Sequence, residues 1–166
     1  MICTSNDYNI SNEDNYNWMR KQYRMDMSKI TEKVDENELM KVFIKTNYPD
    51  KWAKISKFIG PQYWVPVIWL DKYDFGDGTS YIGQWQLEDT SMRHGVGYFE
   101  WAEAWHCGQS QNGEFNGPGI MGWANGDYTE INFVDGEMNG FGTKYTETAE
   151  AKKVKYDIGE FKQYLN

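Results

Sequence analysis

The spacing of apolar side chains separates a helical segment from a longer β-rich part. Over residues 29–60, apolar side chains return every three or four positions, which predicts one or two short helices. Acidic residues lead into the first helix, while Pro49 lies near the start of the second and Gly60 ends it. Leu39, Val42 and Phe43 fall at helical spacing in the first helix, and the expected buried face of the second helix is formed by Trp52, Ile55 and Phe58.

From residue 61 onward the period of the pattern changes to two. Residues 64–69 are mostly β-favouring, and residues 81–85 alternate between the two sides of an extended chain. The Gly-Asp-Gly sequence over residues 76–78 marks a turn between them. These features predict β-strands joined by tight turns.

A short phrase, a polar residue followed by Gly-x-Gly, occurs three times. It covers residues 94–97, 116–119 and 139–142, so successive copies start at almost equal intervals. Repetition at a near-fixed period is typical of repeat proteins, in which each unit is one small hairpin or helix pair. The full unit here runs Tyr-x-Gly-x-Trp, a loop, the Gly-x-Gly phrase and an aromatic strand.

The repeated positions are the candidate structural residues of the fold. They are Tyr81, Gly83, Trp85, Gly95, Gly97 and Trp101 in the first copy, Gly108, Gly113, Gly117, Gly119 and Trp123 in the second, Phe133, Gly136, Gly140 and Gly142 in the third, and Gly159 and Phe161 in a truncated fourth copy that would open at Asp157. Other residues replace the expected ones at His106, Ser110, Thr129 and Ile131.

This unit resembles the MORN repeat, whose pattern is roughly Y-x-G-x-W/F-x-x-G-x-x-H-G-x-G over about 23 residues. The resemblance covers about residues 76–145. It implies a mainly β fold of stacked antiparallel hairpins, an elongated sheet with no pocket of its own. Each hairpin is too small to bury its aromatic face alone, so neighbouring hairpins would stack their rings into one core.

Glycine and charge divide the chain at the same place. All 16 glycines lie between Gly60 and Gly159, and residues 61–150 carry 3 basic against 14 acidic side chains. The expected organisation is an extended arm over residues 1–28, a short helical segment over 29–60 and the repeat domain over 61–166. Because anionic lipids and nucleic acids attract basic residues, this charge disfavours both as partners.

The arm has aromatic and methionine side chains among Asn and Asp, with no sustained period. Such a segment suits docking onto another protein surface. The candidate partner-binding residues are Tyr8, Tyr16, Trp18, Met19 and Tyr23. The alternative is that the arm caps the chain's own sheet, which a repeat array also requires.

The chain offers little that indicates catalysis, and we expect no cofactor and no metal. His106-Cys107 resembles half of a metal site, but no second Cys lies at ligand-like spacing. Asp71, Asp74 and Asp77 lack the closing Glu of a calcium loop, so a solvated turn is the better interpretation. The start of the chain has no leader pattern and only two cysteines occur, which favours an intracellular location.

These observations favour a non-enzymatic structural or adaptor subunit of a larger intracellular assembly. MORN proteins of similar build occur in ciliary axonemes, including radial spokes, and in protist cytoskeletons, so the resemblance implies a cytoskeletal or ciliary location. The partners would be other protein subunits of the complex, while the oligomeric state stays open. The alternative is a membrane- or phosphoinositide-associated adaptor, or an accessory subunit of an enzyme complex.

Overall fold

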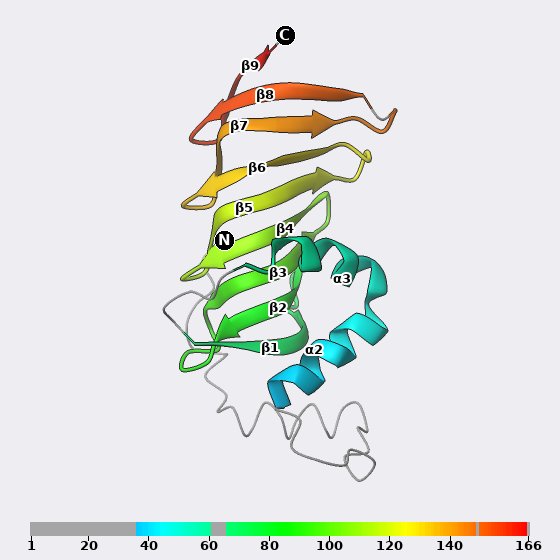
Figure 1. Ribbon diagram of the computed structural model, residues 1–166, viewed down its shortest axis with the longest axis vertical. Helices are drawn as coiled ribbons and strands as arrows, with labels where there is room; N and C mark the ends of the chain where they lie inside the picture. Colours follow the sequence, from blue (N-terminus) through cyan, green and yellow to red (C-terminus); the bar gives the residue numbers. More distant parts are fainter. Residues whose placement is uncertain (1–35, 61–65, 149, 166) are drawn as a thin grey trace.

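The computed structural model describes residues 36–60, 66–148 and 150–165, so the predicted arm over residues 1–28 lies outside the described part. Most of the described residues form one antiparallel sheet of nine strands. Each strand pairs with the next one along the chain, so the strands stack in sequence order along the long axis (Figure 1). The prediction of a mainly β fold of successive antiparallel hairpins is confirmed.

The strands are β1 (Val67–Asp74), β2 (Ser80–Gln86), β3 (Arg93–Trp101), β4 (Ala104–Gln111), β5 (Glu114–Trp123), β6 (Tyr128–Val134), β7 (Glu137–Tyr145), β8 (Ala151–Asp157) and β9 (Glu160–Leu165). Since neighbouring strands run in opposite directions, their connections alternate between two long margins of the sheet. We call the margin that holds the β4–β5, β6–β7 and β8–β9 turns the repeat-turn margin.

Within the described residues, two helices precede the sheet, as predicted. Helix α2 spans Glu36–Asn47, and α3 spans Pro49–Ile55, followed by a single 3-10 turn, η2 (Ser56–Phe58). Pro49 suits the first turn of α3 because its fixed φ fits a helix and its missing N–H would have had no partner there. Asp50 adds a favourable negative charge at the same end.

The helices cover one face of the sheet at β1–β4, which we call the helix face (Figure 1). Ile55 is fully buried against Trp69, and the ring of Trp52 lies 5.5 Å from that of Trp69. The predicted face of the second helix is therefore confirmed. In the first helix, Val42 falls at helical spacing but is 56% exposed.

Met40 and Ile44 form the buried face of α2 instead, together with the partly buried Phe43. They follow the same three- and four-residue spacing that was assigned to Leu39, Val42 and Phe43. Apolar residues occupy two faces of α2, so the spacing alone does not show which face is buried. The face that contacts the sheet is the one with Met40 and Ile44.

The opposite face of the sheet, the aromatic face, is formed by rings. Tyr81 and Trp85 are buried with their ring centroids 5.0 Å apart in an edge-to-face arrangement, and Phe99 packs beside Tyr81 at 6.4 Å. Alternation along each strand sends one set of side chains to the helices and the other to these rings. Neighbouring hairpins thus share one aromatic core, as the repeat pattern predicts.

Glycine pairs let the strands approach beneath these rings. Gly83 pairs with Gly97, and Gly108 pairs with Gly119 one repeat later. A Cβ atom added to Gly97 would overlap the phenol ring of Tyr81, and one on Gly108 would lie 2.5 Å from the Cα of Gly119. The Gly-x-Gly phrase therefore marks positions where a ring or the backbone of the neighbouring strand leaves no room for a side chain.

The repeat-turn margin shows the period of the fold most clearly. Its turns lie at Asn112-Gly113, Asp135-Gly136 and Ile158-Gly159, and in all three both residues have positive φ, from 45° to 87°. Positive φ at both central positions is the geometry of a type I′ hairpin turn. These three turns recur at equal intervals along the chain.

This period corrects the predicted fourth repeat. Gly159 is a turn residue equivalent to Gly113 and Gly136, so the repeat does not open at Asp157. The fourth repeat begins earlier, on β8. Tyr156 on that strand follows Phe133 by the same number of residues that separates successive turns. The turn was not recognised because a β-branched residue such as Ile158 rarely adopts positive φ.

Candidate protein-binding surface

An open groove of about 340 Å³ lies on the aromatic face, between side chains of β3 and the turns and first residues of β5 and β7 at the repeat-turn margin. Its apolar part is made by Phe99, Trp101 and Phe115, of which Phe99 is buried and the other two are half-buried. The rings of Trp101 and Phe115 are nearly parallel, at 12°, with centroids 6.5 Å apart. Two aromatic surfaces thus remain accessible to a partner.

A small residue explains how Phe115 reaches this position. Ser110, its cross-strand partner, stands where the repeat pattern expects Trp or Phe. Phe115 stacks instead on His106, with centroids 3.7 Å apart and planes 13° apart. The departure from the pattern at Ser110 therefore accompanies a rearranged aromatic cluster.

Arg93 lies among the rings of the groove and is fixed by them. Its guanidinium carbon lies 4.6 Å from the centroid of Phe99 and 5.6 Å from that of Phe115. Its Nη2 donates a hydrogen bond to the carbonyl oxygen of Gly113. Cation–π contact and this hydrogen bond hold the positive charge at the base of the groove.

The rim of the groove is acidic. Glu114, Asp135 and Glu137 line it, and all three are exposed. Among the described residues, none of the three carboxylates forms an ion pair with Lys or Arg. Asp135 only accepts a long hydrogen bond, 3.5 Å, from the side-chain amide of Asn116.

His106 and Cys107 point to opposite faces of the sheet. His106 lies between Phe115 and Phe133, where burial and the nearby charge of Arg93 lower its pKa to about 3. Cys107 lies on the helix face, and burial raises its pKa to about 12. Both are therefore uncharged packing residues at neutral pH. In the described part of the chain, no group of three or more His, Cys, Asp or Glu side chains is arranged to hold a metal ion.

The three aspartates near the first turn, Asp71, Asp74 and Asp77, each make different contacts. Asp74 accepts a hydrogen bond from the N–H of Gly76 at 2.8 Å, and Asp77 accepts one from the N–H of Thr79 at 3.0 Å. Asp71 is buried beside Tyr48, whose pKa rises to about 12 through burial and then through this carboxylate. Asp74 and Asp77 thus have the geometry of turn-stabilising side chains.

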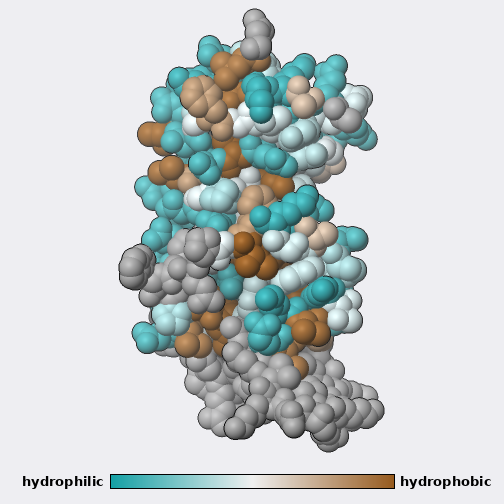
Figure 2. All heavy atoms as spheres, in the orientation of Figure 1, coloured by the Kyte–Doolittle hydropathy of each residue, from teal (hydrophilic) through white to brown (hydrophobic). Residues whose placement is uncertain are grey.

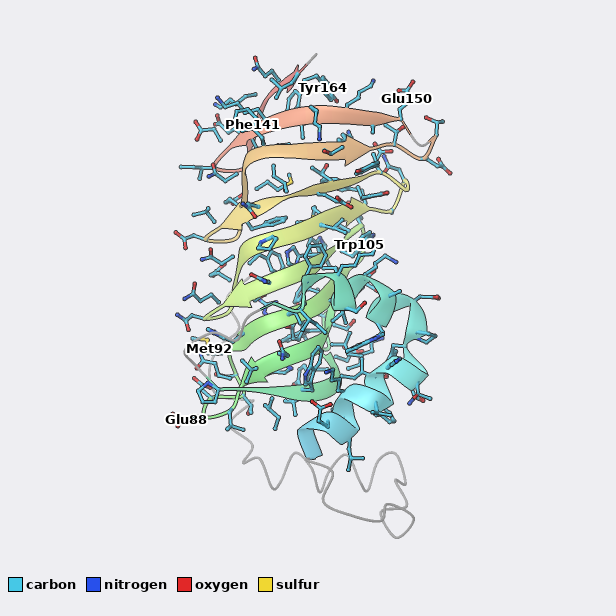
Figure 3. The ribbon with its side chains drawn as sticks, in the orientation of Figure 1. Glu88, Met92, Trp105, Phe141, Glu150 and Tyr164 are labelled. Carbon is cyan, nitrogen blue, oxygen red and sulfur yellow. The ribbon has the colours of Figure 1, made fainter. Side chains whose placement is uncertain are left out.

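A second open pocket, of about 520 Å³, lies on the helix face where α3 ends and the uncovered strands begin. Trp105 forms one wall beside α3 (Figure 3), with the Lys54 ammonium 5.5 Å from its ring centroid. Lys57 and Glu130 also line it, so its charge is mixed. Over the upper strands in this view, hydrophilic side chains surround isolated apolar ones (Figure 2).

The three lysines of β8 do not form one basic patch. Lys152 pairs with Glu150 at 3.4 Å and lies over the ring of Tyr164, whereas Lys155 lies over Phe141 (Figure 3). Lys153 donates a hydrogen bond to Thr143. Successive side chains of a strand alternate between faces, so Lys152 lies on one side of the sheet and the other two on the other. No helix in the described residues is long and apolar enough to cross a membrane.

Most of the sequence-derived candidates are buried rings, turn glycines or glycines at close contacts. Tyr81, Trp85 and Phe133 are buried rings of the aromatic face. Positive φ occurs at Gly83, Gly95, Gly108, Gly113, Gly117, Gly136, Gly140 and Gly159, while ring or backbone atoms leave no space for a side chain at Gly97, Gly119 and Gly142. Trp101 lines the groove, Trp123 ends β5, and Phe161 is 46% exposed on β9. Tyr8, Tyr16, Trp18, Met19 and Tyr23 lie outside the described residues.

Sequence reasoning missed the groove residues Arg93, Phe99 and Phe115. A usable signal exists, because Phe115, Met138 and Phe161 each follow a turn glycine by two positions. That row would have marked a line of large apolar side chains along the repeat-turn margin. The irregular first copy, with its longer loop, gives no comparable signal for Arg93.

No protein-family model matches this chain, and no curated protein matches it either.

Proposed function

We propose that this protein is a non-enzymatic structural or adaptor subunit of a larger intracellular assembly, built on MORN-type repeats. The observation that supports this most is the open groove at Trp101 and Phe115, on the sheet face that α2 and α3 do not cover. A half-buried Trp beside fixed rings, surrounded by charged residues, has the composition of a protein-binding hot spot.

Two buried titratable groups of β4, His106 beside the groove and Cys107 on the helix face, support a binding role rather than catalysis. General acid–base catalysis needs a pKa close to the working pH. His106 has its pKa lowered to about 3 and Cys107 has its pKa raised to about 12. Both are thus held in their neutral forms, which suits packing.

The repeat geometry supports the MORN assignment, from which the proposed location follows. The Gly-x-Gly phrases coincide with close strand contacts, and the type I′ turns share the period of those phrases. An elongated sheet with two broad faces suits a scaffold that contacts several subunits. By resemblance to MORN proteins, we place the protein in a ciliary axoneme or another cytoskeletal structure.

Purification of the tagged chain from its native source, followed by mass spectrometry, tests the proposal. We expect a constant set of protein subunits to co-purify. Removal of residues 1–28 should reduce their recovery while leaving the thermal melt of the repeat domain in place. Recovery of the chain without any constant partner would contradict the adaptor role, and a large drop in melting temperature would assign residues 1–28 to capping instead.

A further inference from the structure

We propose that the groove on the aromatic face binds an extended basic segment of a partner protein, with an arginine stacked on Trp101 and Phe115. The inference rests on the proposed adaptor role and names the chemistry of the partner. It combines three observations: the accessible rings, the carboxylates at the rim that form no ion pair within the described residues, and the regular spacing of those carboxylates.

The rings favour a planar cation. Trp101 and Phe115 are both half-buried, both line the groove and lie nearly parallel with their centroids 6.5 Å apart. A guanidinium group stacks on aromatic faces and loses little hydration when it does so, whereas the ammonium of lysine is compact and strongly hydrated. Arg93 already lies against Phe99 in the same cluster, which shows that these rings accommodate a guanidinium.

The charge of the rim favours the same ligand. Glu114, Asp135 and Glu137 contribute three negative charges, and the one cation among the described lining residues, Arg93, donates to the carbonyl oxygen of Gly113. Two carboxylates therefore remain in excess of the local positive charge. A carboxylate can accept two parallel hydrogen bonds from an incoming arginine.

The carboxylates also recur with the period of the fold. Glu114 and Glu137 each follow a turn glycine, and a carboxylate oxygen of Glu114 lies 2.9 Å from the position a Cβ atom on Gly136 would occupy. Glu137 lies over Gly159 in the same way. The next member, Glu160, is paired with Lys162 at 2.6 Å.

This spacing defines the form of the partner. Glu114 and Glu137 start strands β5 and β7, which lie two strand spacings apart, or about 9.6 Å. Three residues of a polyproline II segment span about 9.3 Å and return side chains to the same side. The matching partner is therefore an extended segment with a basic residue at every third position.

The openness of the groove favours a protein segment over a small molecule. Small ligands are bound in clefts that bury most of their surface. This groove is open, and its lining extends along the repeat-turn margin from Gly113 to Glu137. A segment that lies along the margin can engage successive carboxylates, which a single small cation cannot do.

Fluorescence anisotropy with the full chain and labelled peptides tests the inference. One probe carries arginine at every third position, a second has the same composition with adjacent arginines, and a third carries lysine at every third position. We expect the first peptide to bind about tenfold more tightly than either of the others, because only it satisfies both stacking and spacing.

Variants of the rim and the rings provide the controls. Glu137→Gln and Trp101→Leu should each weaken the first peptide severalfold, whereas Glu147→Gln, which removes the same charge in the β7–β8 connection at the opposite margin, should leave affinity unchanged. Thermal melts check that each variant is folded. Equal binding of the three peptides, no binding, or equal effects of Glu137→Gln and Glu147→Gln would overturn the inference. Co-purification of constant partners with the intact chain would still support the adaptor role in that case.

Discussion

The rings and glycines of the repeat are two parts of one packing arrangement. The ring of Tyr81 fills the space that a side chain at Gly97 would need, and Phe133 packs close to Gly119, 3.2 Å from the position of its missing Cβ atom. These positions need glycine because the neighbouring ring occupies the space that a side chain would fill. Loss of either the ring or the glycine should therefore destabilise the same contact.

Trp85→Ala should lower the free energy of unfolding by about 3–5 kcal/mol, the range for removing a large buried aromatic side chain. Trp85 is 2% exposed and contacts Tyr81 and Tyr73 edge to face. Urea denaturation measures the effect, with Trp123→Ala, at the half-buried end of β5, as the milder control. A free energy of unfolding equal to that of the wild type would rule out the stacked aromatic core.

Gly117→Val should destabilise the protein more than Gly140→Val. Both glycines have positive φ, 100° and 84°, so both variants incur backbone strain on the order of 1–3 kcal/mol. Only at Gly117 would the new side chain meet Gln109, whose Oε1 lies 2.6 Å from the added Cβ position. Gln109 also donates a hydrogen bond to the carbonyl oxygen of Phe58, which joins the helical segment to the sheet. Equal losses in thermal melts would show that strain alone matters.

Acidification should destabilise the protein through its buried histidines. The pKa of His106 is lowered from the ordinary value of 6.5 to about 3, and burial lowers that of His94 as well. Below pH 6.5 the unfolded chain binds a proton at His106 that the native state does not bind, so this stability is present above pH 6.5 and is lost as the pH falls toward 3.

On acidification from pH 7 to pH 5, the low pKa of His106 should reduce the free energy of unfolding by about 2 kcal/mol. Urea denaturation at the two pH values measures it, in the wild type and in His106→Tyr, which restores the residue type found at Tyr81. The variant should lose less stability on acidification than the wild type. The same loss in both proteins would assign the pH dependence to carboxylates elsewhere.

At the scale of elements, the strands could be predicted from the sequence, whereas the position of the turn in the fourth repeat could not. Alternation and Gly-x-Gly spacing predicted the hairpins, because each depends on contacts within one repeat and its neighbour. The Ile158-Gly159 turn and the buried stripe of α2 depend on how an element fits the finished sheet. The groove was missed for the same reason, since Arg93 and Phe115 lie on different hairpins and meet only through strand pairing.

The two helices should stabilise the first strands of the sheet through Ile55. Its side chain is fully buried among the rings of the helix face, so Ile55→Ala should cost about 2–5 kcal/mol. Val42→Ala on α2 is the control, because Val42 is 56% exposed and surface changes usually stay within about 0.5 kcal/mol. Comparable losses for both variants would mean that the helices do not dock as described.

At the scale of the whole molecule, charge is arranged by margin and face. Acidic side chains occupy both margins of the sheet. At the margin opposite the repeat turns, Glu100, Asp127 and Glu150 pair with lysines, whereas Glu114, Asp135 and Glu137 at the repeat-turn margin form no ion pair within the described residues. The basic side chains of β8 are separated by the sheet and take part in local contacts. The sequence shows the excess of acid but not this separation, which requires the alternation of faces along β8.

The isolated protein should therefore not bind anionic membranes at physiological salt. A basic residue contributes about 1 kcal/mol near an anionic surface only if it can approach that surface together with its neighbours. Lys152 lies on one side of the sheet and Lys153 and Lys155 on the other, while residues 61–150 carry 14 acidic side chains against 3 basic ones. Co-sedimentation with vesicles of phosphatidylserine and phosphoinositide measures this, with the triple Lys→Ala variant of the three lysines as a matched control. Robust pelleting that weakens with salt and in the variant would favour the membrane adaptor over the protein scaffold, because the lysines would then act together despite lying on different faces.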